Sequence, residues 1–351
     1  MKDRGIHRAG EVGLNAVTDE DGDPDHDERF SGTYREDISG QILRDDLVPE
    51  ATQEELRYVC EKGVWVKRPK DEARRKTGKG PISVRWVDVN KGDDMNPRYR
   101  SRLVARQMKA HDKSGASFFA PTPPLEALRT VLSLAATRVG DWQPCYDPRS
   151  ERRTQISLMD ISRAYSNAKL DPGVLTYVQL PEEDKDHDSQ CAQLVRHMYG
   201  TRAAADGWQE EYSTFLVETL KFAQGTASPC VFRHGSRELV MTVHGDDFTT
   251  VGPKEDLDWL ETQMQEHYEP DIQPRMGPGP QDANEAVILT RIIRWTESGI
   301  EYEADPRQAE KLVAECGMTD TNTCATAGLR LSYEQLEKDT ELPKHMRTAF
   351  R

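Results

Sequence analysis

The segment LVMTVHGDDFTTVG, residues 239–252, constrains the fold of this chain more than any other. Two runs rich in apolar and β-branched residues flank Gly245-Asp246-Asp247, and Gly and Asp are residues that tight turns prefer. The pattern predicts an antiparallel hairpin with carboxylates where its strands meet. An ordinary turn is the more common explanation of an isolated Gly-Asp-Asp; the long apolar strands on either side favour a functional site here, but the spacing alone leaves a structural role open.

A further carboxylate, Asp160, follows the apolar run Ile156–Met159 and is also expected at a strand end. Adjacent residues of a strand face opposite sides, so one of the paired aspartates is expected to be the stronger ligand. Three carboxylates at neighbouring strand ends would form an oxygen-rich site for two Mg²⁺ ions. Such a site suits phosphoryl transfer, because the ions clamp the attacking and leaving oxygens.

Charge is distributed unevenly along the 351 residues, whose net charge is -14. Residues 1–58 hold 7 Lys/Arg against 16 Asp/Glu, whereas residues 62–113 hold 16 against 6, a local net charge of +10. A basic block of this kind fits contact with a polyanion such as nucleic acid. A solvated basic surface is the other explanation.

Several classes of protein are excluded by composition. No apolar run approaches the length of a membrane span, and the N-terminus has no apolar core of a secretory signal. Six scattered cysteines without a Cys-x-x-Cys pair support neither a disulfide framework nor a structural zinc site. We therefore expect a protein of a reducing compartment.

Hydrophobic periodicity predicts a mixed α and β chain after an acidic, disordered segment 1–50. The first expected helix is near Thr52–Cys60, with Thr52 as its N-terminal cap. The other expected helices are Leu125–Arg138, Ala203–Leu220, Glu255–His267 and Pro306–Cys316. The expected strands lie around Val64–Val66, Ile82–Val89, Tyr99–Gln107 and Gln155–Ile161, followed by the hairpin above and one about Glu297–Gly299.

The order of six motifs adds a stronger signal than any one of them. Among them are RWVDVNKGDDMNPRYRSRLVARQMK, FFAPTPPLEALRTVLSLAA, SLMDISRAYSNAKL and LVRHMYGTRAAADGWQEEYSTFL, together with YVQLPEE and MTVHGDDFTTVG. Across about Trp65 to Leu331 the chain resembles reverse transcriptases of the Ty1/copia type. The resemblance covers roughly three-quarters of the sequence, with its motifs in the family's order.

The resemblance implies an α+β right-hand polymerase fold with fingers and palm, in which helices pack on an antiparallel palm sheet. It divides the chain into a disordered acidic segment (1–50), a fingers-like region (51–157) and a palm with its connection to a thumb-like region (158–331). A truncated C-terminal segment (332–351) follows. The chain then looks like a fragment of a polyprotein or a degraded genomic copy.

The resemblance also assigns roles to individual residues. Asp160, Asp246 and Asp247 become the catalytic aspartates that bind two Mg²⁺ (or Mn²⁺) ions. Tyr165 falls on the aromatic beneath the sugar of the incoming nucleotide, and the strand residues Arg100, Arg102 and Arg106 face triphosphate or template. His244, Gly245 and Arg202 are expected at the primer–template. A core aromatic at Tyr165, a turn residue at His244 and surface ion pairs at the arginines remain alternatives.

The implied function is RNA-directed DNA polymerisation, with a primer–template and dNTP as partners and no membrane. Integrase and RNase H domains would be its polyprotein neighbours, in a cytoplasmic particle or the nucleus. The family's glutamine is replaced by Ala203, which supports an alternative: a nucleic-acid-binding relic without turnover. A metal-dependent phosphotransferase would need a nucleotide loop such as GxxxxGKS, which the sequence lacks.

Overall fold

The computed structural model describes residues 33–37, 40–93, 95–107, 120–304, 306–315, 317–318 and 332. The chain divides into two compact units, 1–304 and 305–351. The described elements of the second unit amount to one helix, α7 (Pro306–Glu315). No helix among the described residues is long and apolar enough to cross a membrane.

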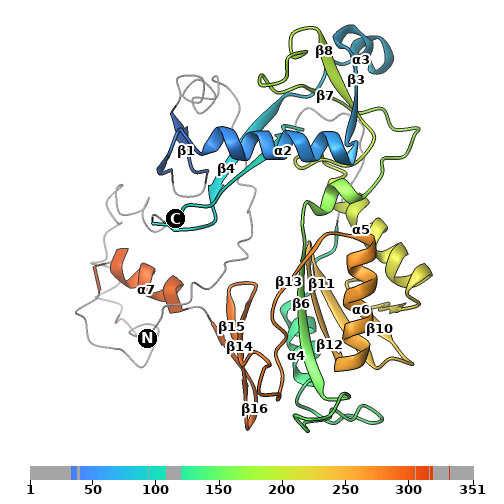
Figure 1. Ribbon diagram of the computed structural model, residues 1–351, viewed down its shortest axis with the longest axis vertical. Coiled ribbons are helices and arrows are strands. Elements are labelled where there is room, and N and C mark those ends of the chain that lie inside the picture. The colour runs from blue at the N-terminus through green and yellow to red at the C-terminus, as the bar shows by residue number, and fades with distance from the viewer. Residues whose placement is uncertain are drawn as a thin grey trace. The chain divides into compact units, whose positions relative to one another are not determined.

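The largest sheet of the first unit is antiparallel, with strand order β13-β6-β12-β11-β10-β9 (Figure 1). Its central strands are the expected ones, so the predicted hairpin and the predicted strand before Asp160 are confirmed. The strands are β6 (Thr154–Ile161), β9 (Ala223–Gln224), β10 (Val231–His234), β11 (Leu239–His244), β12 (Asp247–Pro253) and β13 (Pro270–Ile272).

Helices cover both faces of this sheet (Figure 1). On one face, α5 (Ala204–Thr214), its π-helical continuation η3 (Phe215–Thr219) and α6 (Lys254–His267) bury a core that includes Trp208, Phe248 and Met241. On the other face, α4 (Leu125–Leu134) packs with β14 (Glu285–Ile288), β15 (Arg291–Thr296) and β16 (Gly299–Ala304). Alternation along β6 sends Met159 and Ile161 to the first face and Ile156 and Leu158 to the second.

A separate core lies under the N-terminal elements of the unit. There α2 (Val48–Lys62) packs on β5 (Tyr99–Ala105), which pairs with β4 (Val84–Asn90). A three-stranded sheet of β3 (Trp65–Pro69), β8 (Gln190–Leu194) and β7 (Tyr177–Gln179) completes this core, and α3 (Lys70–Thr77) follows β3.

Several sequence predictions differ from the structure at element ends. The first helix begins at Val48, so Thr52 is not its cap; the Thr52 hydroxyl instead donates to Ser101 within the core. The helix after Pro124 ends at Leu134 rather than 138, and the strand predicted to reach Gln107 ends at Ala105. The predicted C-terminal hairpin is three-stranded, because Leu289 and Thr290 adopt positive φ values and make a further turn.

Part of the segment predicted to be disordered is ordered. Strands β1 (Tyr34–Arg35) and β2 (Ile42–Leu43) pair with each other, and the first turn of α2 also precedes residue 51. The carboxylate of Asp37 accepts hydrogen bonds from Arg85 and from the backbone of Asp88, so the turn between β1 and β2 is tied to β4. The rest of that prediction, residues 1–32 and 38–39, lies outside the described residues.

Candidate active site

The turn that joins β11 to β12 consists of Gly245 and Asp246, and His244 and Asp247 form the last paired position of the hairpin. Gly245 has a φ of 64°, in the left-handed region that glycine occupies without strain. The indole N–H of Trp208, a side chain only 1% exposed, donates to the carbonyl oxygen of Gly245 at 2.9 Å. A core residue of α5 therefore anchors the turn.

A row of aspartates crosses the sheet at this end. Asp247 of β12 lies directly opposite Asp160 of β6, and Asp160 lies directly opposite Asp271 of β13. Directly paired residues of antiparallel strands project from the same face. The backbone also links the turn to this row, because the Ile161 N–H donates to the Asp246 carbonyl oxygen at 3.0 Å. The structure thus places the three aspartates singled out from the sequence at adjoining strand ends.

The electrostatics of these carboxylates show that they are crowded and partly buried. Burial raises the pKa of Asp160 to about 6, and the negative charges of Asp246 and Asp271 add to the increase. The pKa of Asp246 is also raised, again mainly by burial. Arg100 and Lys91 oppose both increases. These two cations therefore lie near enough to the aspartates to stabilise their ionised forms.

Arg100 and Lys91 come from the β4–β5 hairpin. Burial is the main cause that lowers the pKa of each. Repulsion from Arg102 lowers the pKa of Arg100 further, and repulsion from Arg100 and Arg102 does the same to Lys91, while Asp160 and Asp246 act in the opposite direction. The Nε atom of Arg100 is buried and makes no hydrogen bond within the described part of the chain. A buried cationic donor without a hydrogen-bond acceptor is costly, and an anionic ligand would relieve that cost.

The predicted arginines do not act as one set. Arg102 forms an ion pair with Glu55 of α2 at 2.8 Å, and both side chains are largely buried. Arg106 lies beyond the end of β5, where its backbone N–H donates to the carbonyl oxygen of Ser83. Of the three, Arg100 is the one whose charge the structure brings near the aspartates.

Tyr165 lies in a short 3₁₀ helix, η2 (Ala164–Asn167), that follows β6. Its ring lies 4.7 Å from the ring of Tyr199 at an angle of 56°, and it packs on the core beneath the sheet. Burial raises the pKa of Tyr165, and the negative charge of Asp246 adds to the shift. Tyr165 is therefore both a partly buried core aromatic and a neighbour of the acidic turn.

The segment before α5 is held against the end of β5 by its backbone. The Ala105 N–H donates to Tyr199, the Gln107 N–H donates to Gly200, and the Arg202 N–H donates to the side-chain oxygen of Gln107. Gly200 has a φ of 80°, and a Cβ there would lie 1.9 Å from the carbonyl oxygen of Ala105. Glycine at position 200 therefore allows the backbone before α5 to lie this close to the end of β5.

Two charged neighbours of the site were missed from the sequence. Lys91 sits in the turn NKGDDMNP, where a lysine is unremarkable, and Asp271 lies on the three-residue strand β13. The one available signal for Lys91 was its place inside the basic block. Asp271 carries no local signal, because only the register of β13 against β6 brings it beside Asp160.

The donor chemistry of the row fits a divalent metal. Carboxylate oxygens are the ligands that Mg²⁺ prefers, and a bound cation would stabilise the ionised form of Asp160, whose pKa is raised by burial and by the negative charges of Asp246 and Asp271. As the side chains stand, no three His, Cys, Asp or Glu residues in the described part of the chain are grouped closely enough to hold an ion. Metal binding would therefore require side-chain adjustment at Asp160, Asp246 or Asp247.

Comparison with known proteins identifies the family. The family model described as reverse transcriptase (RNA-dependent DNA polymerase) matches residues 65–273. The chain belongs to this family. It is 25% identical over 220 residues to the retrovirus-related Pol polyprotein from transposon TNT 1-94 of Nicotiana tabacum, a match that covers 59% of this chain and 15% of the polyprotein. The Pol polyprotein from transposon RE2 of Arabidopsis thaliana is 26% identical over 180 residues, covering 49% of this chain and 11% of the polyprotein.

These relatives confirm the predicted kinship with retrotransposon reverse transcriptases of the Ty1/copia type. The chain spans less than a fifth of the length of either polyprotein. Among solved structures, the foamy viral protease-reverse transcriptase in complex with an RNA/DNA hybrid matches with a TM-score of 0.41 and 12% identity. That match covers 76% of this chain and 28% of the viral chain.

Proposed function

We propose that this reverse transcriptase-family chain is an RNA-directed DNA polymerase that adds a deoxynucleotide to the 3′-hydroxyl of a primer paired with a template. The observation that carries the proposal is the row of Asp247, Asp160 and Asp271 beside the Asp246 turn, near enough to the cations Arg100 and Lys91 for their charges to act on Asp160 and Asp246. Acidic groups for a metal and basic groups for phosphate, brought together from separate elements, suit nucleotidyl transfer.

Asp160, Asp246 and Asp247 would hold the metal ions, for which we propose two Mg²⁺ or Mn²⁺. When bound, divalent ions act as Lewis acids toward phosphate oxygens and lower the charge repulsion of the reaction. The chain supplies the frame for them, since Asp160 and Asp247 are in register on paired strands and Trp208 anchors the turn that carries Asp246. The backbone frame would thus be in place before metal binds, and only the carboxylate side chains would have to adjust.

The remaining roles follow from placement around this row. Arg100 and Lys91 would bind phosphate oxygens of the nucleotide, a role supported by the unpartnered Nε of Arg100. Tyr165, a neighbour of Asp246, would pack beneath the sugar. His244 and Gly245, on the hairpin turn, would contact the primer end, and Arg202 the template side. Arg102 would act indirectly, since Glu55 already pairs with its guanidinium.

We also propose the domain division that the family resemblance implies. Residues 51–157 would form the fingers and 158–331 the palm with its connection to a thumb, between an N-terminal segment 1–50 and a C-terminal segment 332–351. A primer–template and dNTP would be the partners, and integrase and RNase H domains would be neighbours in a longer intracellular polyprotein. Backbone contacts to the nucleic acid would make binding sensitive to salt.

A nucleic-acid-binding relic without turnover is the second candidate, and one specific feature favours it. Ala203 stands where the family has a glutamine, and it precedes α5 with no side-chain cap. A lost neutral hydrogen bond costs roughly 0.5–1.5 kcal/mol, or about threefold to tenfold in rate, which would weaken turnover without abolishing it.

Primer extension on poly(rA)/oligo(dT) with Mg²⁺ or Mn²⁺ separates the two candidates. We expect weak, metal-dependent incorporation that Asp246→Asn removes and Ala203→Gln increases. Asp188→Asn, the same change at an exposed residue, is the matched control and should leave incorporation unaltered. No incorporation with either metal, before or after Ala203→Gln, would establish the relic. Incorporation that survives Asp246→Asn would place the activity elsewhere.

A further inference from the structure

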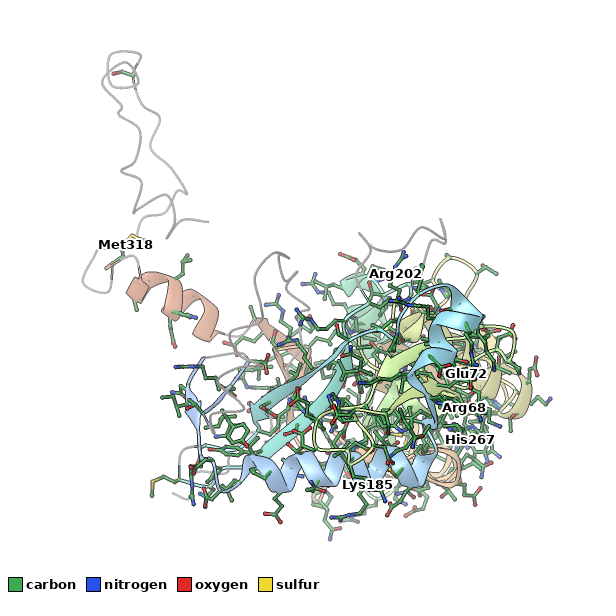
Figure 2. All side chains as sticks on the ribbon, turned by 90° about the horizontal axis from the view of Figure 1, so that it is seen from above. Arg68, Glu72, Lys185, Arg202, His267 and Met318 are labelled. Atoms are coloured by element: carbon green, nitrogen blue, oxygen red, sulfur yellow. The ribbon has the colours of Figure 1, made fainter. Side chains whose placement is uncertain are left out.

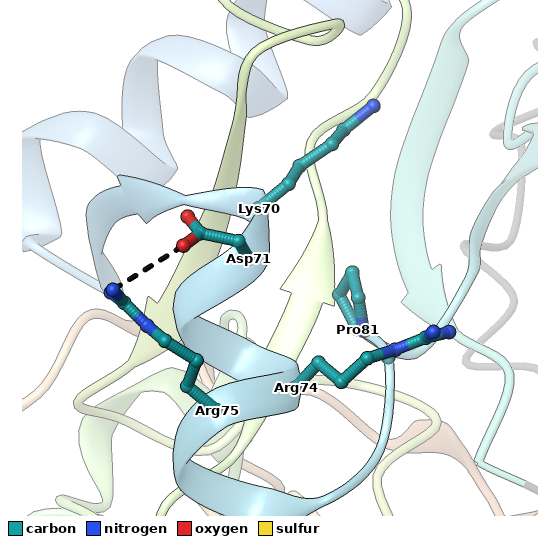
Figure 3. A pocket seen from close by; sticks show the side chains of 6 residues that line it. Lys70, Asp71, Arg74, Arg75 and Pro81 are labelled. Atoms are coloured by element: carbon teal, nitrogen blue, oxygen red, sulfur yellow. Dashed lines mark ion pairs between the residues drawn. The ribbon is translucent and has the colours of Figure 1, made fainter.

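A cavity of about 490 Å³ opens beside α3. None of its lining residues belongs to the aspartate row. Its walls are α3 and the segment Gly80–Pro81 (Figure 3). Three of the lining side chains are cationic and one is acidic: Lys70, Arg74, Arg75 and Asp71. The cavity therefore carries a formal surplus of two positive charges.

The acidic side chains of α3 pair with some of the surrounding cations and leave others unpaired. Arg75 pairs with Asp71 at 3.4 Å, as the dashed line in Figure 3 marks. Just outside the cavity, Lys76 and Arg68 lie 2.8 Å and 3.9 Å from Glu72, and Figure 2 shows Arg68 and Glu72 together. Each acid of α3 is thus already matched with a cation.

Lys70 and Arg74 are the two cavity cations left over. Neither side chain makes a hydrogen bond or an ion pair to another described residue. They are four residues apart on one helix, a spacing that puts both on the same face, and Figure 3 shows both extending on the side of Pro81. Arg75, in contrast, points toward Asp71.

The chemistry of this pair suits phosphate. A guanidinium binds two phosphate oxygens in a planar fork, while an ammonium contributes a point charge with rotatable donors. The first turn of α3 carries Asp71 and Glu72, which offset the positive end of the helix dipole, so the anion-binding charge of the site comes from Lys70 and Arg74 themselves. The cavity also belongs to the block 62–113, whose net charge is +10.

We propose that the α3 cavity binds backbone phosphates of a nucleic-acid strand through Lys70 and Arg74, as an anchoring site additional to the proposed active site. The identity of the polyanion as nucleic acid rests on the proposed function; the anionic character of the ligand rests on the cavity itself. The site positions the strand without reading its sequence, since phosphate contacts carry no base information.

The salt dependence of binding tests this proposal directly. Each phosphate neutralised by a protein cation contributes about 0.7 to 0.9 to the slope of log K against log salt. For Lys70→Ala/Arg74→Ala we expect the slope for a fluorescent RNA/DNA hybrid, measured by anisotropy on the full chain, to fall by about 1.4 to 1.8. Lys70→Gln/Arg74→Gln, which keeps more of each side chain, should give the same change.

A control variant that loses the same number of positive charges elsewhere distinguishes binding at the cavity from a general effect of net charge. Arg57→Ala/Arg233→Ala removes two exposed cations that have no side-chain partner in the described part of the chain, and it should leave the slope within error of wild type. Arg75→Ala, which removes a cation already paired with Asp71, should change it by less than half as much as the Lys70/Arg74 variant. Thermal melts of every variant should match wild type.

Three outcomes would overturn the proposal: an unchanged slope in the Lys70/Arg74 variants, an equal fall in the Arg57/Arg233 control, or poly-glutamate competing as well as nucleic acid. The last would assign the cavity to acidic peptides. The test is independent of catalysis, because Asp246→Asn should abolish extension and leave this slope contribution intact. Failure of the polymerase proposal and failure of the anchoring site are thus distinguishable.

Discussion

Glu55 joins two parts of the fold through one carboxylate, and its removal gives the sharpest test of the packing described above. The same oxygen, Oε2, accepts hydrogen bonds from Arg102 of β5 and from Arg163 just after β6, each at 2.8 Å. The Glu55 side chain is 5% exposed, and the side chains of both arginines are 15% exposed. Arg163 also has a φ of 50°, a left-handed conformation that is rarely adopted without compensating contacts.

Glu55→Ala should therefore destabilise the protein strongly. It leaves Arg102 without its carboxylate partner and leaves Arg163 with only the exposed Glu54 carboxylate, and breaking a buried pair by removing one partner costs about 3–5 kcal/mol. Glu55→Gln keeps an acceptor but loses the charge, so its cost should be nearer the roughly 1.5–3 kcal/mol of a charged hydrogen bond. Glu54→Ala is the matched control. Glu54 is 67% exposed and contacts the same Arg163 at 3.2 Å, which predicts a loss of about 1 kcal/mol or less.

Urea unfolding followed by circular dichroism and tryptophan fluorescence measures these differences, provided that both probes report one transition. The order of stability should be wild type, Glu54→Ala, Glu55→Gln, Glu55→Ala. If Glu55→Ala costs no more than Glu54→Ala, the reasoning fails, because the two guanidinium groups would then be finding solvent or other acceptors at little cost. A double-mutant cycle with Arg102→Ala checks the pairing itself, and coupling near zero would contradict it.

Other predictions concern the aspartate row and the close approach at Gly200. Because the pKa of Asp160 is raised to about 6, its ionisation costs stability above that pH. Asp160→Asn should then have a higher melting temperature than wild type at pH 7–8. This difference in melting temperature should shrink between about pH 6 and pH 4, where the native carboxyl becomes protonated. A difference that does not change with pH would show that ionisation of Asp160 is not its cause. Millimolar Mg²⁺ should raise the wild-type melting temperature at pH 7.5 but not that of Asp160→Asn/Asp246→Asn, and equal shifts in both would exclude a metal at these carboxylates. Gly200→Ala should lower the free energy of unfolding by well over 1 kcal/mol, because its Cβ would meet the Ala105 carbonyl oxygen. At Gly140 φ is also positive but the space is open, so Gly140→Ala should lose only about 1 kcal/mol through backbone strain. Similar losses in both variants would show that the contact at position 200 relaxes.

Local patterns in the sequence were sufficient where one strand or turn decides the structure. The apolar run before Asp160 predicts β6, and the Gly-Asp turn between β-rich runs predicts the β11–β12 hairpin. Neither pattern specifies that β6 pairs with β12 so that Asp160 faces Asp247. That pairing joins residues more than 80 positions apart, and only the family resemblance pointed to it.

Tertiary contacts explain the predictions that were wrong. Thr52 and Glu55 have the spacing of a helix cap, yet Thr52 lies inside α2 and bonds to Ser101, while Glu55 bonds to Arg102 and Arg163. Their polar groups serve contacts with distant strands rather than the helix end. Local propensity could not anticipate this, because the partners lie at least 47 residues away in the sequence.

The two strand arginines show how burial and pairing separate residues that look equivalent in sequence. Alternation along β5 puts Arg100 and Arg102 on one face, as predicted. Glu55 then neutralises Arg102, which leaves Arg100, with Lys91, as the cationic counterpart of the aspartate row. Even with both cations nearby, the pKa of Asp160 remains raised to about 6, so burial and the neighbouring carboxylates outweigh their attraction. Desolvated positive and negative groups thus face one another without complete neutralisation, and a bound ligand that carries both cation and phosphate would satisfy both sets at once.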